Sequence, residues 1–115
     1  MTNILINDQA QMVRITGHAE FDKEGKDIVC AGVSTLAWTL AGALTKIEAL
    51  TYVEDTGGDM LICYKAVPQA LVYVDMFCTG AEMLQYKYPK NVTYQGRKSE
   101  LKNDTIQEKG GVVCH

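Results

Sequence analysis

The 115-residue sequence has no excess of basic charge, no long apolar run and no recognisable secretion signal. Its formal net charge of −3 provides no basic surface field, which argues against sequence-independent binding of nucleic acid. No run approaches the roughly 18 apolar residues that a membrane-spanning helix needs, and the N-terminal residues lack the basic start of a signal peptide. We therefore expect a cytoplasmic protein that binds neither nucleic acid nor a membrane directly.

Motifs for metals and cofactors are also lacking. The four cysteines form no Cys-x-x-Cys pair and the two histidines no His-x-x-x-His pair, although Cys114 and His115 could join His18 and Cys30 around a zinc ion. Gly57 belongs to no glycine-rich nucleotide-binding pattern, so a turn is the favoured interpretation. We expect neither a metal nor an organic cofactor. The irregular cysteine spacing also argues against a disulfide framework.

The composition fits one small domain. Apolar residues make up 47% of the chain, which is enough for a single core. We place this domain at residues 1–96. Residues 97–111 are charged and nearly free of apolar side chains, so we interpret residues 97–115 as a polar tail with the composition of a disordered segment.

Alternating apolar residues, helical spacings and turn residues predict the order strand, strand, helix, strand, strand, helix, strand. Asn7 and Asp8 suit the turn of a first hairpin, and Gly57 and Gly58 suit the turn of a second. Pro68 suits the first turn of the second helix. The expected ranges are 4–6, 12–16, 28–47, 51–54, 60–65, 68–87 and 91–94. This order predicts an α+β fold, with a mostly antiparallel sheet packed against two helices.

Both expected helices have an apolar face. The first helix also carries many Ala and Gly residues, which predicts close packing on more than one side. In the second helix we expect Leu71, Val74, Cys78 and Ala81 to form the buried face. Cys63 and Cys78 are interpreted as core residues, because free cysteine usually behaves as a small hydrophobic side chain.

Residues 17–34 contain the groups best suited to chemistry. Cys30 falls in the first turn of the expected helix, where the helix dipole and unpaired backbone N–H groups favour a thiolate. His18 ends the second strand and could complete a thiolate–imidazolium pair, while free N–H groups at the helix start could stabilise an oxyanion. The polar segment 19–26 is predicted to be a mobile loop that closes over a peptide, with Gly17 and Gly25 as its hinges.

The same residues also have simpler interpretations. A cysteine at a helix start is more often inert than catalytic. Asp27 is expected to be the N-cap of the helix, and could instead orient the imidazole of His18. Ser34 lies one turn after Cys30 on the same helical face and could hydrogen-bond into the site. The residues alone leave both a structural and a catalytic cysteine open.

A resemblance to a known family favours catalysis. The tripeptide Gly-His-Ala at residues 17–19 and the block Gly-Lys-Asp-Ile-Val-Cys-Ala-Gly-Val-Ser at residues 25–34 together resemble the ribosomal-processing cysteine protease family, Prp. The resemblance extends over residues 3–95. It implies a small α/β homodimer in which Cys30 is the nucleophile and His18 the general base and acid, and Asp27 and Ser34 match positions that assist.

The resemblance also implies a class of substrate. Members of the family remove a short N-terminal extension from a large-subunit ribosomal protein, and phage structural proteins with similar extensions are cut by the same activity. The tail at residues 97–115 lies outside the family pattern, which suggests a phage or mobile-element member that processes a capsid or scaffold precursor. The alternative from another class is a catalytically silent dimeric module that binds a ribosomal or capsid segment.

Overall fold

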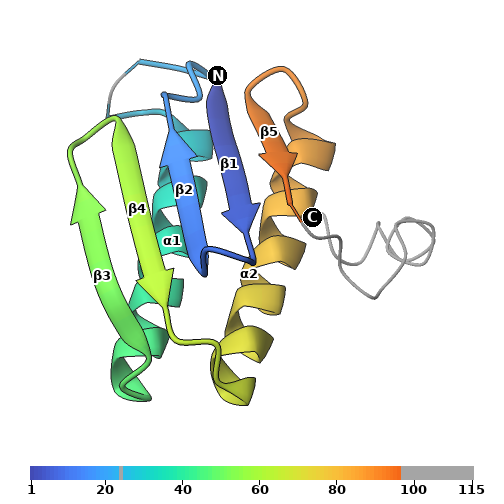
Figure 1. The fold of residues 1–115 in the computed structure, drawn as a ribbon. Helices are drawn as coiled ribbons and strands as arrows, with labels where there is room; N and C mark the ends of the chain where they lie inside the picture. The colour runs from blue at the N-terminus through green and yellow to red at the C-terminus, as the bar shows by residue number, and fades with distance from the viewer. Residues whose placement is uncertain (24, 97–115) are drawn as a thin grey trace.

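The computed structural model describes residues 1–23 and 25–96, and within them the chain forms a five-stranded sheet and two helices (Figure 1). The predicted tail at residues 97–115 lies outside the described residues, so the domain boundary at residue 96 stays a prediction. The order of elements agrees with the order predicted from the sequence. The elements are β1 (Thr2–Asn7), β2 (Met12–Thr16), α1 (Ile28–Lys46), β3 (Leu50–Asp55), β4 (Asp59–Tyr64), α2 (Pro68–Lys87) and β5 (Val92–Gln95).

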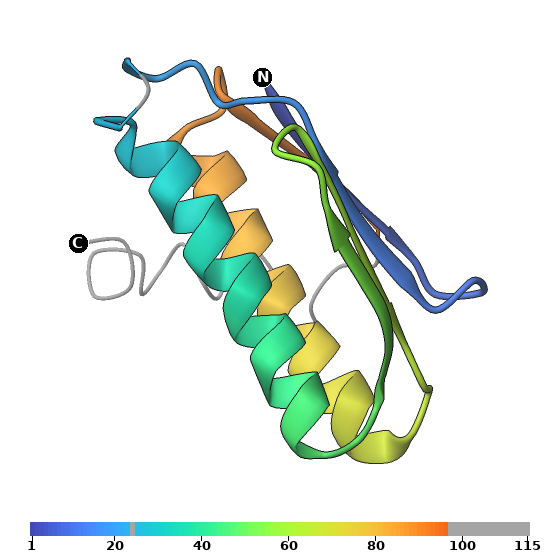
Figure 2. The same ribbon diagram turned by 90° about the vertical axis from the view of Figure 1, so that its left-hand side faces the viewer.

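The sheet is mostly antiparallel, as predicted, with the strand order β3-β4-β2-β1-β5. Three of its pairings are antiparallel, and β5 runs parallel to β1 with Val92 opposite Thr2. Both helices cover the same face of the sheet and leave the other face open (Figure 2). The fold is therefore α+β, in two layers. This topology brings the end of β2, the β3–β4 turn and the start of α1 to one end of the molecule (Figure 1).

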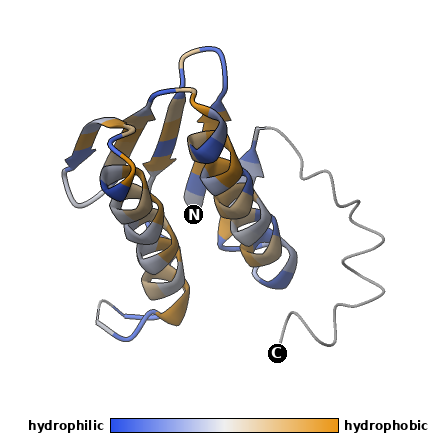
Figure 3. Ribbon diagram, turned by 90° about the horizontal axis from the view of Figure 1, so that it is seen from below, coloured by the Kyte–Doolittle hydropathy of each residue, from blue (hydrophilic) through white to orange (hydrophobic). Residues whose placement is uncertain are grey.

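The core lies between the helices and the sheet, where Val13, Ile62, Leu44 and Val74 are fully buried. Apolar segments of the strands and of both helices are visible in the hydropathy colouring (Figure 3). Alternation along β4 turns Ile62 inward, and it places Cys63 on the open face. The prediction that Cys63 is a core residue is therefore wrong.

The buried face of α2 differs in part from the predicted one. Val74, Cys78 and Ala81 are buried as expected. Leu71, however, is 36% exposed, whereas Phe77 is 2% exposed. The spacing of Ala70, Val74, Phe77 and Ala81 places the buried stripe one position away from Leu71. The expectation for Leu71 is therefore wrong.

The two helices cross closely because glycines lie at their contact. A Cβ added at Gly80 of α2 would lie 2.7 Å from Leu36 Cδ1 of α1, and one added at Gly32 would lie 3.5 Å from Leu84 Cδ2. α1 therefore packs against the sheet on one side and against α2 on another, as its small residues predicted. Its remaining face is exposed, and Trp38 is 48% accessible to solvent.

One sequence-based expectation about α1 needs correction. Among the described residues, α1 is by length and composition the one helix apolar enough to span a membrane. Core helices of soluble proteins meet the same criterion, and α1 packs on the sheet and on α2. The absence of membrane binding stays a prediction.

Candidate active site

The end of β2 directs His18 toward the start of α1. Gly17 has a φ of +83°, a backbone conformation that residues with a Cβ rarely adopt, and its N–H donates to Gly58 O at 2.9 Å. This bond ties the strand end to the β3–β4 turn. A Cβ added at Gly58 would lie 3.5 Å from His18 Nε2, so the imidazole lies directly beside this turn.

Asp27 is the N-cap of α1, as predicted. Its Oδ1 accepts hydrogen bonds from the N–H groups of Val29 and Cys30, each at 2.9 Å. Its Oδ2 accepts from the N–H groups of Phe21 and Asp22, at 2.9 and 3.3 Å. One carboxylate therefore fixes both the helix start and the preceding loop. These contacts are those of an N-cap residue. The alternative prediction was that Asp27 orients His18, and these four hydrogen bonds do not involve His18.

The hydrogen bonds favour the ionised form of Asp27. Partial burial on its own would raise the pKa of this carboxyl group, but the N–H groups of Cys30, Phe21 and Asp22 and the thiol of Cys30 outweigh it, and the pKa is lowered. The cap is consequently a carboxylate at neutral pH.

Three N–H groups at the helix start already have hydrogen-bond partners, whereas the sequence predicted free donors there. The N–H groups of Val29 and Cys30 bond to the Asp27 side chain, and the Ala31 N–H donates to Asp27 O at 3.1 Å. The expectation that these donors are available for an oxyanion is therefore wrong. A different backbone donor, the Ala19 N–H, points at Cys30 Sγ from 3.3 Å.

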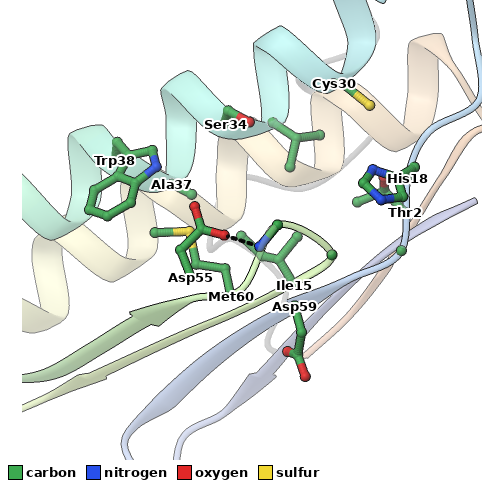
Figure 4. Close-up of a pocket in the computed structure, with 14 residues that line it drawn as sticks. Thr2, Ile15, His18, Cys30, Ser34, Ala37, Trp38, Asp55, Asp59 and Met60 are labelled. Carbon is green, nitrogen blue, oxygen red and sulfur yellow. Dashed lines mark hydrogen bonds between the residues drawn. The ribbon is translucent and has the colours of Figure 1, made fainter. Parts of the chain in front are cut away.

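Cys30 and His18 lie at the junction of two adjoining cavities of about 150 and 470 Å³. Both side chains line both cavities, as does Ser34 one turn along α1. Figure 4 shows Cys30, Ser34 and Trp38 in succession along the helix, with His18 across the space from Cys30. The structure thus brings Cys30, His18 and Ser34 together.

The remaining predicted residues divide between the two cavities. Gly17 lines the smaller cavity, and Asp27 and Gly25 line the larger. Gly25 has a φ of +85° with open space around its Cα. The hinge roles predicted for Gly17 and Gly25 concern motion, and they stay predictions. The catalytic roles predicted for the other residues concern chemistry, and they also stay predictions.

The loop between His18 and Cys30 is held at several points in this structure. Ala19 is 1% exposed, and its carbonyl accepts a hydrogen bond from Asn91 Nδ2 at 2.9 Å. The ring of Phe21 meets the ring of Tyr88 edge-on, with centroids 5.4 Å apart. Closure of this loop over a substrate stays a prediction.

Sequence reasoning missed the far wall of the smaller cavity. Trp38, Asp55 and Met60 line it together with the β3–β4 turn (Figure 4). Asp55 Oδ1 accepts a hydrogen bond from the Gly57 N–H at 2.9 Å, which fixes the turn. The glycines of this turn are the sequence signal for this wall, and on their own they indicate only a hairpin connection.

Metal ligation has no support among the described residues. Within residues 1–23 and 25–96, no group of three His, Cys, Asp or Glu side chains could hold a metal ion. Among the described cysteines, Cys30, Cys63 and Cys78 are not in disulfides. Cys114 and His115, the other ligands considered, lie outside the described residues.

Comparison with known proteins supplies the family. Residues 1–93 match the family described as cysteine protease Prp. The ribosomal processing cysteine protease Prp of Bacillus subtilis is 33% identical over 57 residues, which span 50% of this chain and 51% of that protein, about half of its length.

Two solved structures have a similar fold. The ribosomal processing protease Prp of S. aureus, in complex with a covalently linked product peptide, superimposes with a TM-score of 0.70 at 22% identity and covers 84% of this chain and 97% of its own. A Streptococcus mutans protein gives 0.64 at 27% identity, with 82% and 90% covered. Because its family match extends over residues 1–93, the chain belongs to the cysteine protease Prp family.

Proposed function

We propose that this protein is a cysteine endopeptidase in which Cys30 is the nucleophile and His18 the general base and acid. The observation that supports it is the convergence of both side chains on the same two cavities, from the first turn of α1 and the end of β2. A thiol and an imidazole on separate, anchored elements can be held at a fixed separation, which nucleophilic catalysis requires. A peptide crossing the junction would meet both groups.

The proposed reaction has two stages. His18 takes the thiol proton, and the Cys30 thiolate attacks the scissile carbonyl carbon to form a tetrahedral oxyanion. The C–N bond then breaks as the His18 imidazolium protonates the departing amine, leaving a thioester on Cys30. In the second stage His18 deprotonates a water molecule, which attacks the thioester and releases the carboxylate product and the thiolate. The Ala19 N–H, which donates to Cys30 Sγ at 3.3 Å, stabilises the negative sulfur.

Asp27 and Ser34 assist in different ways in this proposal. Asp27 holds the first turn of α1 and the loop through four backbone N–H groups, so it fixes where Cys30 lies. Ser34 is exposed and lines both cavities, so its hydroxyl can hydrogen-bond to a bound peptide. Gly17 and Gly25 supply the backbone conformations at the two ends of the loop.

The proposed substrate is a protein with a short N-terminal extension. The Bacillus subtilis and S. aureus relatives are named as ribosomal processing proteases, and the S. aureus protein has been solved with a substrate peptide. We therefore propose a large-subunit ribosomal protein as the substrate, cut in the cytoplasm. A phage capsid or scaffold precursor is the second candidate, suggested by the tail at residues 97–115.

The outer face of the helical layer supports the proposed homodimer. A groove of about 490 Å³ runs between α1 and α2, and Leu36, Trp38, Tyr73 and Phe77 contribute to its lining. Met76 also lines it and is 67% exposed. Apolar surface of this kind is usually covered in solution, and a second copy of the chain would cover it. Light scattering after gel filtration should give the mass of a dimer for wild type and the mass of a monomer for Met76→Glu. A monomeric wild type at micromolar concentration would contradict the dimer.

The protease proposal is tested with synthetic peptides that span candidate N-terminal extensions. Wild type should cut one internal peptide bond, located by mass spectrometry, whereas Cys30→Ala and His18→Ala should show no detectable turnover. Cys63→Ala is the matched control, since Cys63 is a free thiol on the opposite face of the sheet. It should cut at the wild-type rate.

Alkylation separates the protease from the silent binding module. Iodoacetamide should modify Cys30 at neutral pH faster than Cys63, because a thiolate reacts and a thiol does not. If Cys30→Ala cuts the peptide at the wild-type rate, the mechanism is wrong. If wild type binds the peptide without cutting it and Cys30 reacts no faster than Cys63, the binding module is correct.

A further inference from the structure

Ala19 is clamped on both sides between Cys30 and a residue of the C-terminal part of the fold. Its N–H donates to Cys30 Sγ at 3.3 Å, and its carbonyl accepts from Asn91 Nδ2 at 2.9 Å. Only the NH₂ group of a carboxamide can donate to a carbonyl, so the orientation of the Asn91 side chain is determined by this bond. Ala19 itself is 1% exposed, which leaves water little access to either contact.

Asn91 is held by its own backbone. Its N–H donates to Tyr88 O at 3.0 Å, and its carbonyl accepts from the Thr2 N–H at 2.8 Å. It therefore lies at a junction of α2, β1 and β5, three elements of the rigid layers. A side chain anchored in this way can impose a position on the loop that it contacts.

The other loop anchor cannot do the same. Asp27 ties Phe21 and Asp22 to the start of α1, the helix that also carries Cys30. That tether moves with the nucleophile. Asn91 ties Ala19, and hence the peptide that follows His18, to the junction of α2, β1 and β5. Through Ala19, Asn91 can therefore fix where the segment after His18 lies relative to Cys30.

From this geometry we propose that Asn91 is a positioning residue for the nucleophile. Its carboxamide holds the Ala19 carbonyl so that the Ala19 N–H stays directed at Cys30 Sγ and stabilises the thiolate. The inference rests on the proposed function of Cys30, and it adds a residue 72 positions away from Ala19 to the machinery of the site.

The charges around Cys30 determine which measurements are informative. The two cavities that meet at Cys30 are lined by His18 from the end of β2, by Glu20 and Asp22 from the loop, by the cap Asp27, and by Asp55 and Asp59 from the β3–β4 hairpin. Five of these groups are carboxylates. Glu20 is paired with the N-terminal ammonium and Asp59 with Arg14, and the other three oppose a thiolate. A directed N–H donor therefore matters for the ionisation of Cys30 beyond any effect on folding.

The test compares three substitutions in the full chain. Asn91→Ala removes the donor, and Asn91→Asp keeps the shape but places a carboxylate oxygen against the Ala19 carbonyl. Asn7→Asp is the matched control, because Asn7 Oδ1 is an acceptor for the Ala10 N–H, which a carboxylate preserves, in the turn at the far end of the sheet (Figure 1). The readouts are the rate of Cys30 alkylation by iodoacetamide across pH, kcat/KM on a cleaved peptide, and thermal stability.

Both Asn91 variants lose the bond to the Ala19 carbonyl, so the Ala19 N–H is no longer held toward Cys30 Sγ. Loss of this second bond, which is made to a charged sulfur, is expected to lower the alkylation rate at neutral pH and kcat/KM by about tenfold or more. The midpoint of the alkylation profile should also move to higher pH. Asn7→Asp should match wild type. Folded Asn91 variants with the wild-type alkylation profile and wild-type kcat/KM would overturn the proposal, since a merely structural role changes only the thermal stability.

Two further outcomes remain decisive. If wild type cuts no peptide but the Asn91 variants still shift the alkylation profile, the proposed protease function fails and the positioning role stands. If neither Asn91 variant folds, nuclear magnetic resonance of wild type replaces them. The Ala19 amide and the Asn91 carboxamide should then shift together as Cys30 is titrated, and a carboxamide that does not respond would overturn the role.

Discussion

Substitution of Gly17 by alanine should both destabilise the protein and displace His18. The φ of +83° at Gly17 is costly for any residue with a Cβ, and the added Cβ would lie 2.3 Å from the backbone oxygen of Met1. A separation that short cannot be accommodated, so either the first residues of β1 or the strand end that carries His18 must move. Because the obstacle is a backbone atom, no side-chain rotation relieves it.

The magnitude follows from two separate costs. The left-handed conformation costs a non-glycine residue about 1–2 kcal/mol, and forced overpacking costs a further amount of about 1–3 kcal/mol. Reduced freedom of the unfolded chain offsets about 0.4–1 kcal/mol. Gly57→Ala is the matched control for stability, since Gly57 has a φ of +91° with nothing within 4 Å of an added Cβ. The difference between the two variants therefore isolates the clash, about 1–3 kcal/mol.

Urea unfolding of both variants measures this difference, and peptide cleavage by Gly17→Ala measures its effect on the site. A displacement of His18 by about 1 Å would lower kcat/KM by about 100-fold. The reasoning is refuted if Gly17→Ala loses no more free energy of unfolding than Gly57→Ala and also retains the wild-type kcat/KM.

A fall in pH and the truncation of a core side chain should each change the free energy of unfolding. Because the pKa of Asp27 is lowered in the folded state, its contribution is complete above the ordinary aspartate pKa of about 3.9 and is lost as the pH falls through the folded value. Asp27→Asn should therefore be less stable than wild type at pH 7, and urea titrations at decreasing pH should show the two converging. Phe77→Ala removes a ring that is 2% exposed, so calorimetry and urea unfolding should show a loss of about 3–5 kcal/mol, with a loss under 1 kcal/mol contradicting the assigned core.

Local patterns in the sequence predicted the elements well. Asp27 marks a helix start by its side-chain hydrogen bonds and Pro68 by its fixed backbone angle, so α1 and α2 begin where the sequence predicted. The pairings within the two predicted hairpins are confirmed, but the pairing of distant strands was beyond reach, because the parallel contact between β5 and β1 joins residues about 90 positions apart. The exposed Leu71 and the outward Cys63 have a common cause. Each is apolar, and only the direction of the packed face decides whether it is buried.

The site was predictable where the chain itself brings groups together. His18 and Cys30 flank one loop, and Ser34 follows Cys30 by one helical turn, so proximity along the chain indicated proximity in space. Trp38 and Asp55 were missed because one lies two turns along α1 and the other on a separate hairpin. The oxyanion expectation failed for another reason. A capping carboxylate satisfies the N–H groups that a bare helix start would leave free.

The anchors of the 19–26 loop have one property that bears on substrate choice. Gly17 bonds to Gly58, Ala19 to Cys30 and Asn91, and the following N–H groups to Asp27, in each case through backbone atoms of the loop and strand end. Three side chains of the loop add to these anchors: the Phe21 ring packs on Tyr88, Asp22 Oδ1 accepts from the Lys23 N–H, and Glu20 pairs with the N-terminal ammonium. Glu20 and Asp22 line the larger cavity, and their carboxylates do not form the backbone bonds to Cys30, Asn91 and Asp27. Substitution of these two side chains should therefore alter contacts with a peptide while the backbone bonds to Cys30, Asn91 and Asp27 are kept.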